Sequence, residues 1–187
     1  MEKVITYFEE PGKSNTDELI KLVKDRLVDS NIKYIAIASV SGESALKLAD
    51  AVEGVQIINV THHAGFKEKN SLELEDAKRA ELESKGIITF AGSHALSGAG
   101  RGISNKFGGV TPVEIIAASL RMFSQGIKVC AEISIMLADA GLIPVDEEII
   151  AIGGRAHGVD SAVILTPANM TNVLDMKFHE IIAMPRP

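Results

Sequence analysis

Short runs of β-branched and aliphatic residues alternate with longer segments of helical period along the chain, and this alternation constrains the fold most. Because apolar residues recur every three to four positions in the longer segments, those segments are expected to be helices. The order of strands and helices is typical of a mainly parallel sheet with helices on both faces, so we predict a three-layer α/β/α sandwich. The predicted strands cover residues 4–8, 34–38, 55–60, 87–90, 148–152, 161–166 and 179–184.

The predicted helices cover residues 15–30, 45–52, 74–84, 111–124 and 127–140. Asn15 with Glu18, and Thr111 with Glu114, have the spacing of a helix capping box. Residues 127–140 are apolar almost all round and should form a buried helix, in which Cys130 is an inert core thiol and Glu132 a buried structural partner.

Two features depart from the regular alternation. Residues 92–109 contain six glycines and no sustained apolar period, which predicts a long loop that is functional rather than disordered. The last two strands follow each other without a long helix between them, so we expect them to pair antiparallel at an edge of the sheet.

Composition restricts the partners of this chain. A length of 187 residues suits a single domain, 1–187. The chain has 19 Lys and Arg residues and 25 Asp and Glu residues, which gives a net charge of −6. No global basic field is present to attract nucleic acid or an anionic membrane surface. A single cysteine excludes an internal disulfide and a cysteine-rich zinc site, and the first residues do not resemble a leader, so a cytoplasmic protein is expected.

The segment 39–45 joins a predicted strand to a predicted helix. At the carboxyl ends of parallel strands, the start of a helix offers unpaired N–H groups and the positive end of its dipole. Serine hydroxyls can donate hydrogen bonds to a phosphate there, and glycine lets the backbone come close; alternatively, Ser41 or Ser44 only caps the helix. The candidate phosphate contacts are Ser39, Val40, Ser41, Gly42, Glu43, Ser44 and Ala45.

Loops after other predicted strands should border the same pocket. An arginine offers a planar fork to ligand oxygens, phenylalanine is the candidate for ring contact in a chain without Trp, and His94 is the weak candidate for acid–base catalysis. The alternatives are a solvated or subunit-contact loop at 92–109 and a plain turn at 153–158. The candidate contacts are Thr61, His62, Gly65, Phe66, Ser93, His94, Ser97, Arg101, Phe107, Gly153, Gly154 and Arg155.

Nucleotide and metal motifs are incomplete. Tyr7 stands where a P-loop ending at Gly12-Lys13-Ser14 needs its first glycine, although Lys13 could still contact an anion. Ile103 stands where a dinucleotide motif needs its last glycine. His62 and His63 are adjacent and should point to opposite sides of an extended chain, so no metal site is expected.

Residues 35–45 resemble the strand, the Ser/Thr-x-Ser-Gly-x-Thr-Ala loop and the helix of the C-terminal α/β domain of pyruvate kinases, and Val60-Thr61 resembles the end of that family's next strand. In that family the loop holds a phosphate of a sugar bisphosphate effector. Nearly the whole chain is similar to stand-alone archaeal-type proteins of this fold, through Tyr7-Phe8, Pro11-Gly12, Asn15-Thr16, Ser93-His94, Leu96-Ser97-Gly98, Gly108-Gly109-Val110, Lys128-Val129-Cys130, Gly153-Gly154-Arg155 and Met184-Pro185-Arg186.

The resemblance implies a phosphate pocket and flavin mononucleotide (FMN) as its ligand. It does not imply pyruvate kinase activity, because the catalytic barrel of that enzyme is not among these residues. We therefore expect binding of a phosphorylated small molecule, with a flavin-dependent oxidoreductase and a regulatory sensor of a sugar phosphate as alternatives. A homo-oligomer is also expected, because residues 127–140 are too apolar to be exposed wherever the fold does not bury them completely.

Overall fold

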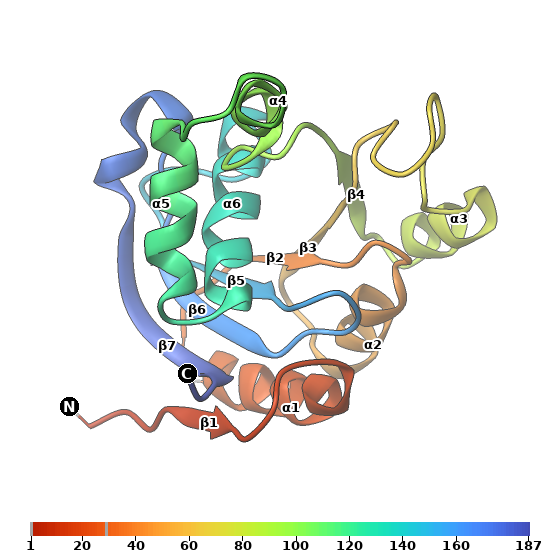
Figure 1. Cartoon of the computed structure of the whole chain (residues 1–187). Coiled ribbons are helices and arrows are strands. Elements are labelled where there is room, and N and C mark those ends of the chain that lie inside the picture. Colours follow the sequence, from red (N-terminus) through yellow and green to blue (C-terminus); the bar gives the residue numbers. More distant parts are fainter. Residues whose placement is uncertain (1, 29) are drawn as a thin grey trace.

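The computed structural model describes residues 2–28 and 30–187. In these residues seven strands form one sheet in the order β1-β7-β6-β5-β2-β3-β4 (Figure 1). Each predicted strand is confirmed to within about two residues. The observed strands are β1 (Thr6–Phe8), β2 (Tyr34–Ala38), β3 (Gln56–Thr61), β4 (Ile88–Ala91), β5 (Ile149–Gly153), β6 (Ser161–Thr166) and β7 (Lys177–Pro185).

The sheet is mainly parallel, as predicted. Strand β2 runs parallel to β3 and β5, β3 runs parallel to β4, and β1 runs parallel to β7. Strand β6 is antiparallel to both β5 and β7. The antiparallel pairing of the last two strands is confirmed, but their expected place at the sheet edge is wrong, because β1 pairs with β7 and takes that edge.

Helices cover both faces of the sheet (Figure 1), which confirms the three-layer sandwich. Helices α1, α2 and α3 lie on one side, and α6 lies on the other with α5 and α4 packed beyond it. The helices are α1 (Thr16–Leu27), α2 (Glu43–Ala51), α3 (Asp76–Ser84), α4 (Gly98–Phe107), α5 (Pro112–Arg121) and α6 (Gln125–Asp139), with short 3-10 helices η1 (Lys13–Asn15) and η2 (Met170–Asp175).

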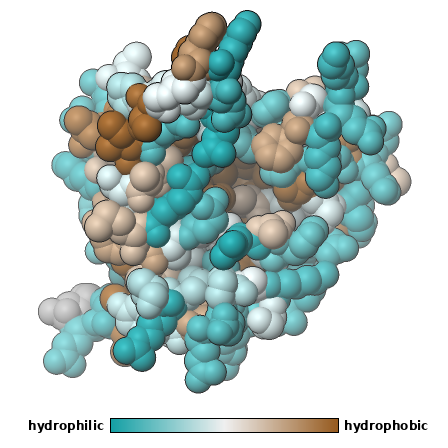
Figure 2. Space-filling model, in the orientation of Figure 1, coloured by the Kyte–Doolittle hydropathy of each residue, from teal (hydrophilic) through white to brown (hydrophobic). Residues whose placement is uncertain are grey.

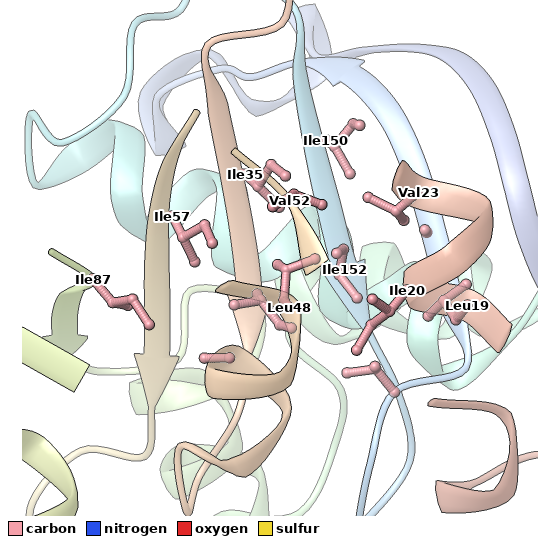
Figure 3. Packing of buried hydrophobic residues seen from close by; sticks show 14 of the residues in the cluster. Leu19, Ile20, Val23, Ile35, Leu48, Val52, Ile57, Ile87, Ile150 and Ile152 are labelled. Atoms are coloured by element: carbon pink, nitrogen blue, oxygen red, sulfur yellow. The ribbon is translucent and has the colours of Figure 1, made fainter. Parts of the chain in front are cut away.

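Two hydrophobic cores hold these layers together, one on each face of the sheet. On the first, Leu19 of α1 and Leu48 of α2 pack with Ile35 and Ile152 of the central strands (Figure 3). On the second, α6 packs on the sheet through residues that include the fully buried Cys130. A strand buried on both faces needs a continuous apolar run, which is why the sequence of β2 reads Tyr-Ile-Ala-Ile-Ala.

Helix α6 is buried within a single chain, between the sheet and α5. Its apolar surface therefore requires no second copy of the protein, and the expected homo-oligomer stays a prediction. Exposed apolar side chains gather instead on α4, on α5 and between them, and include Phe107, Val110 and Ile115. No helix in the described part of the chain has the length and apolar character needed to cross a membrane.

The predicted long loop over residues 92–109 is wrong, because residues 98–107 form α4. Glycine disfavours helix by about 1 kcal/mol per residue, and contacts with α5 act against that preference. The Ser104 hydroxyl donates to Glu114 Oε1 at 2.9 Å. Gly100 lies so close to α5 that a Cβ atom would come within 2.7 Å of Thr111 Oγ1.

One of the two predicted capping boxes is confirmed. Glu114 Oε2 accepts the backbone N–H of Thr111 at 3.0 Å, which closes the box at the start of α5. The box predicted at Asn15 is wrong, since its side chain caps no helical N–H. Asn15 Nδ2 instead donates to the carbonyl oxygen of Glu10 at 2.7 Å, so the side chain fixes the turn that precedes η1.

Candidate ligand-binding site

A cavity of about 670 Å³ opens where β2, β3 and β5 end and α6 passes beside them. Its volume lies within the usual range of small-molecule sites, about 300–1,000 Å³. Figure 2 shows hydrophilic side chains around a recess on the face turned to the viewer. In a mainly parallel sheet this end of the strands is where ligands bind, and the loops that follow the strands decide which ligand.

The loop from β2 to α2 forms one wall of the cavity. Ser39 Oγ accepts the backbone N–H of Ser44 at 3.2 Å, and Ser41 Oγ accepts that of Glu43 at 3.5 Å. Ser41 therefore does cap the helix, whereas Ser44, the other capping candidate, only donates its backbone N–H to Ser39. A hydroxyl that accepts an N–H keeps its own proton to donate. Capping fixes the hydroxyl oxygens at the cavity wall, so the capping and phosphate-binding interpretations are compatible.

Two neighbouring elements hold this loop in place. Thr61, at the end of β3, is 1% exposed and donates from Oγ1 to the Val40 carbonyl at 3.0 Å. Gly42 has φ of 80°, and a Cβ atom there would lie 2.9 Å from Cδ1 of Leu82 in α3. Glycine is therefore required both for the backbone conformation and for the packing of α3.

Four lysines and three glutamates line the cavity, and each lysine lies within ion-pair distance of a carboxylate. Lys13 Nζ lies 3.4 Å from Glu43 Oε2, so the carboxylate on the β2–α2 loop faces a cation. Lys47 Nζ lies 2.6 Å from Asp17 Oδ1 at the opening. Both pairs are exposed to solvent, so their charges remain accessible to a ligand.

A buried ion pair on α6 lies deeper in the cavity. Lys128 Nζ donates to Glu132 Oε2 at 2.5 Å, and both side chains are 5% exposed. Glu132 Oε1 also accepts the backbone N–H of Leu96 at 3.0 Å, which ties α6 to the segment after β4. Burial lowers the pKa of Lys128, and the charge of Glu132 opposes that shift.

Three histidines and a phenylalanine meet at the ends of β3 and β4. Phe66 stacks on His62 with a centroid distance of 3.8 Å, and His94 lies 5.3 Å from His62 and 5.5 Å from His63. The expectation that His62 and His63 point to opposite sides is wrong: both rings lie against Phe66 and His94, in the segment that follows the end of β3 at Thr61.

The acidic partner of this cluster is Glu73. Its Oε2 lies 2.6 Å from His62 Nδ1, and its Oε1 lies 2.6 Å from Lys67 Nζ. Burial pushes the pKa of Glu73 upward, but the hydrogen bonds from Lys67 and His62 outweigh burial and hold that pKa below its usual value. For His94, burial is the main cause of a lowered pKa, so its ring is neutral at pH 7.

The turn between β5 and β6 forms a further wall of the cavity. Asp160 Oδ2 accepts the Gly12 N–H at 2.9 Å, and Thr16 Oγ1 accepts the Val159 N–H at 3.1 Å. At Gly158 an added Cβ would come within 2.5 Å of the Lys13 backbone, so only glycine allows the two loops to touch. These contacts bring the start of α1 to the cavity.

The structure gathers about half of the predicted ligand contacts around this cavity. These are Ser39, Val40, Ser41, Glu43, Ser44, Thr61, His62, Phe66, His94 and Gly154. Gly42, Ala45 and Gly153 are buried behind its walls, whereas Gly65, Arg101, Phe107 and Arg155 are exposed outside its lining. Ser93 and Ser97 line a different cavity, beside α4.

Sequence reasoning did not identify several lining residues, which include Lys47, Lys67, Glu73, Gln125, Lys128 and Met136. A signal existed for one of them: Lys128 and Glu132 stand four residues apart on an otherwise apolar helix, a spacing that pairs opposite charges. Among the residues described, no group of three or more His, Cys, Asp or Glu is placed to hold a metal ion.

Comparison with known proteins places the chain in a family. The family model described as pyruvate kinase, alpha/beta domain, matches residues 17–165. Similar solved structures include a pyruvate kinase from Cryptosporidium parvum, with 14% identity over 82% of this chain and 23% of that chain, at a TM-score of 0.44. The Cryptosporidium parvum pyruvate kinase in complex with ADP is 14% identical over 87% of this chain and 23% of that chain, at a TM-score of 0.40. The chain thus spans about a quarter of the length of these enzymes.

Proposed function

Since the chain belongs to the family of the pyruvate kinase alpha/beta domain, we propose that it binds a phosphorylated small molecule, FMN first among the candidates, in the cavity at the ends of β2 and β3. The observation that carries the proposal is the β2–α2 loop, whose serine oxygens are fixed by helix N–H groups at the wall of a ligand-sized cavity. The match covers only the alpha/beta domain, so phosphoryl transfer is no part of the proposal.

The β2–α2 loop would hold the phosphate. The Ser39 and Ser41 hydroxyls have protons to donate, and the amino end of α2 adds the positive end of its dipole. Lys13 and Lys47 border the same wall and supply positive charge. Lys13 also offsets the carboxylate of Glu43, the one feature of the loop that would repel an anion.

The deeper cavity suits a ring such as the isoalloxazine of FMN. The loops that follow β3 and β4 form an aromatic wall, which consists of His62, Phe66 and His94. Lys128 and Gln125 are the side-chain donors available to ring oxygens on the α6 side. A bound flavin would supply hydride or one-electron transfer chemistry.

A flavin-dependent oxidoreductase is the second candidate, and the histidine cluster favours it. Oxidation and reduction of a flavin are coupled to proton movement, which needs an acid–base group nearby. His94 lines the cavity and is neutral at pH 7, while Glu73 orients His62. A regulatory site for a sugar phosphate would use the β2–α2 loop without needing these histidines.

Thermal unfolding with four ligands tests the proposal: FMN, riboflavin, inorganic phosphate and a sugar bisphosphate. At about 100-fold excess over Kd, FMN should stabilise by about 2.7 kcal/mol and raise Tm by about 5–10 °C. Riboflavin, which lacks the phosphate, should raise it less. Ser41→Asp should abolish the FMN effect by charge repulsion, whereas Ser119→Asp, the same change on the exposed surface of α5, should not.

The outcomes separate the parts of the proposal. If the sugar bisphosphate raises Tm and FMN does not, the phosphate site stands and the flavin assignment is wrong. If no ligand raises Tm, or if Ser41→Asp responds to FMN like the parent protein, the phosphate site itself is wrong.

A further inference from the structure

A second cavity, here called the α4 cavity, has a volume of about 570 Å³ and lies between β4, α4, α5, α6 and η2. Its lining is dominated by small or apolar side chains, among them Ala95, Ala99, Val113, Met136 and Met170. Methionine side chains are flexible and polarisable, so they adapt to apolar ligands of different shape. The space persists because glycines and alanines form much of the wall that α4 contributes.

The α4 cavity touches the proposed phosphate cavity at two side chains. His94 and Met136 are the lining residues that both cavities share. One imidazole and one thioether therefore stand between them, and molecules bound in the two cavities would both reach His94. Because burial lowers the pKa of His94, its ring is neutral at pH 7 and can both donate and accept a hydrogen bond.

The charges around the two cavities differ. Four lysines line the phosphate cavity, whereas no lysine or arginine occurs in the lining described for the α4 cavity. The acidic residue there, Asp139, already accepts the Met170 N–H at 3.0 Å and Asn169 Nδ2 at 3.1 Å through Oδ1. An anion would lose its hydration in the α4 cavity without gaining a cationic partner, so anionic ligands are disfavoured there.

We propose that the α4 cavity binds a second ligand, an uncharged and mostly apolar small molecule, and holds it against His94 beside the phosphorylated ligand. The volume accommodates a molecule of one or two rings, and burial of its apolar surface supplies the binding energy. The few polar groups at the wall, chiefly His94 and the hydroxyls of Ser93 and Ser97, would orient one polar atom of that molecule.

Indole is a suitable probe because it is uncharged, largely apolar and has one N–H donor. Its binding is measured by isothermal titration calorimetry and by the chemical shift of the His94 Cε1 proton, one of five histidine signals, assigned with His94→Gln. The parent protein should bind indole saturably, and the His94 signal should move more than the other four.

Matched variants locate the bound indole. Ala99→Phe, an exposed position on the rim of the cavity, should fill it and weaken binding by about tenfold or more, and Val113→Phe should do the same from α5. Ala118→Phe, an equal change on the exposed side of α5, should leave the affinity unchanged. The Tm of each variant shows that it is folded.

Ser41→Asp distinguishes this proposal from the proposed phosphate site, because the variant should lose the FMN effect but bind indole as tightly as the parent protein. The proposal is overturned if indole binding is not saturable, if Ala99→Phe and Val113→Phe bind it as tightly as Ala118→Phe, or if the His94 signal does not respond. None of these results depends on whether FMN binds.

Discussion

Replacement of Gly42 by alanine should damage stability and ligand binding together, because this glycine is both the N-cap of α2 and a contact of α3. Its φ of 80° lies in the left-handed region, where a residue with a Cβ atom is about 1–2 kcal/mol less stable. The new methyl would also lie 2.9 Å from Leu82 Cδ1, and Leu82 is fully buried.

The packing cost can be separated from the backbone cost. Because Leu82 cannot move into solvent, overpacking should add about 1–3 kcal/mol to the conformational penalty. Gly54 is a matched control: its φ is 76°, and a Cβ atom there would meet nothing within 4 Å. Both substitutions restrict the unfolded chain equally, so the difference between them reports the contact with Leu82.

Urea unfolding of the two variants measures this difference, with equal m-values as the condition for comparison. We expect Gly42→Ala to lose about 2–5 kcal/mol and Gly54→Ala about 1–2 kcal/mol. Gly42→Ala should also weaken FMN binding, since the methyl displaces the loop that carries Ser39 and Ser41, while Gly54→Ala should not. Equal destabilisation by both variants would refute the packing argument.

Other regions of the fold give further testable expectations. Burial raises the pKa of the Cys130 thiol, so iodoacetamide should label it only after denaturation, as mass spectrometry can show. Burial lowers the pKa of His94 in the folded protein, so as the pH falls the imidazole becomes protonated in the unfolded chain before it does in the folded one. The free energy of unfolding should therefore decrease as the pH drops below about 6.5. Urea midpoints should show a smaller decrease for His94→Gln than for the parent protein. Lys128→Met should cost about 3–5 kcal/mol in urea unfolding, because the buried charge of Glu132 loses its cationic partner, and adding Glu132→Gln should recover part of that loss. If the exposed Phe107 contributes to the expected homo-oligomer, Phe107→Ser should lower the mass measured by sedimentation equilibrium, and an unchanged mass would exclude it from the interface.

Local sequence patterns were sufficient to predict the strands, most of the helices and the position of the loop between β2 and α2. Periodicity and turn residues are encoded over a few neighbouring positions, and burial of β2 on both faces leaves a visible apolar run. The loop of residues 39–45 could be recognised for the same reason, since a strand, a glycine turn and a helix start are adjacent in the chain.

Contacts between residues far apart in the sequence determined the features that no short stretch of the sequence encodes. Helix α4 forms despite its glycines because α5 packs against it, and β1 takes the sheet edge because the distant β7 pairs with it. His62 meets His94 only because β3 and β4 are neighbours in the sheet, and Lys128 reaches the cavity because α6 crosses the ends of the strands. The sequence by itself determined the strands, most of the helices and the loop of residues 39–45, whereas the side chains that surround this loop come from elements that only the tertiary structure brings together.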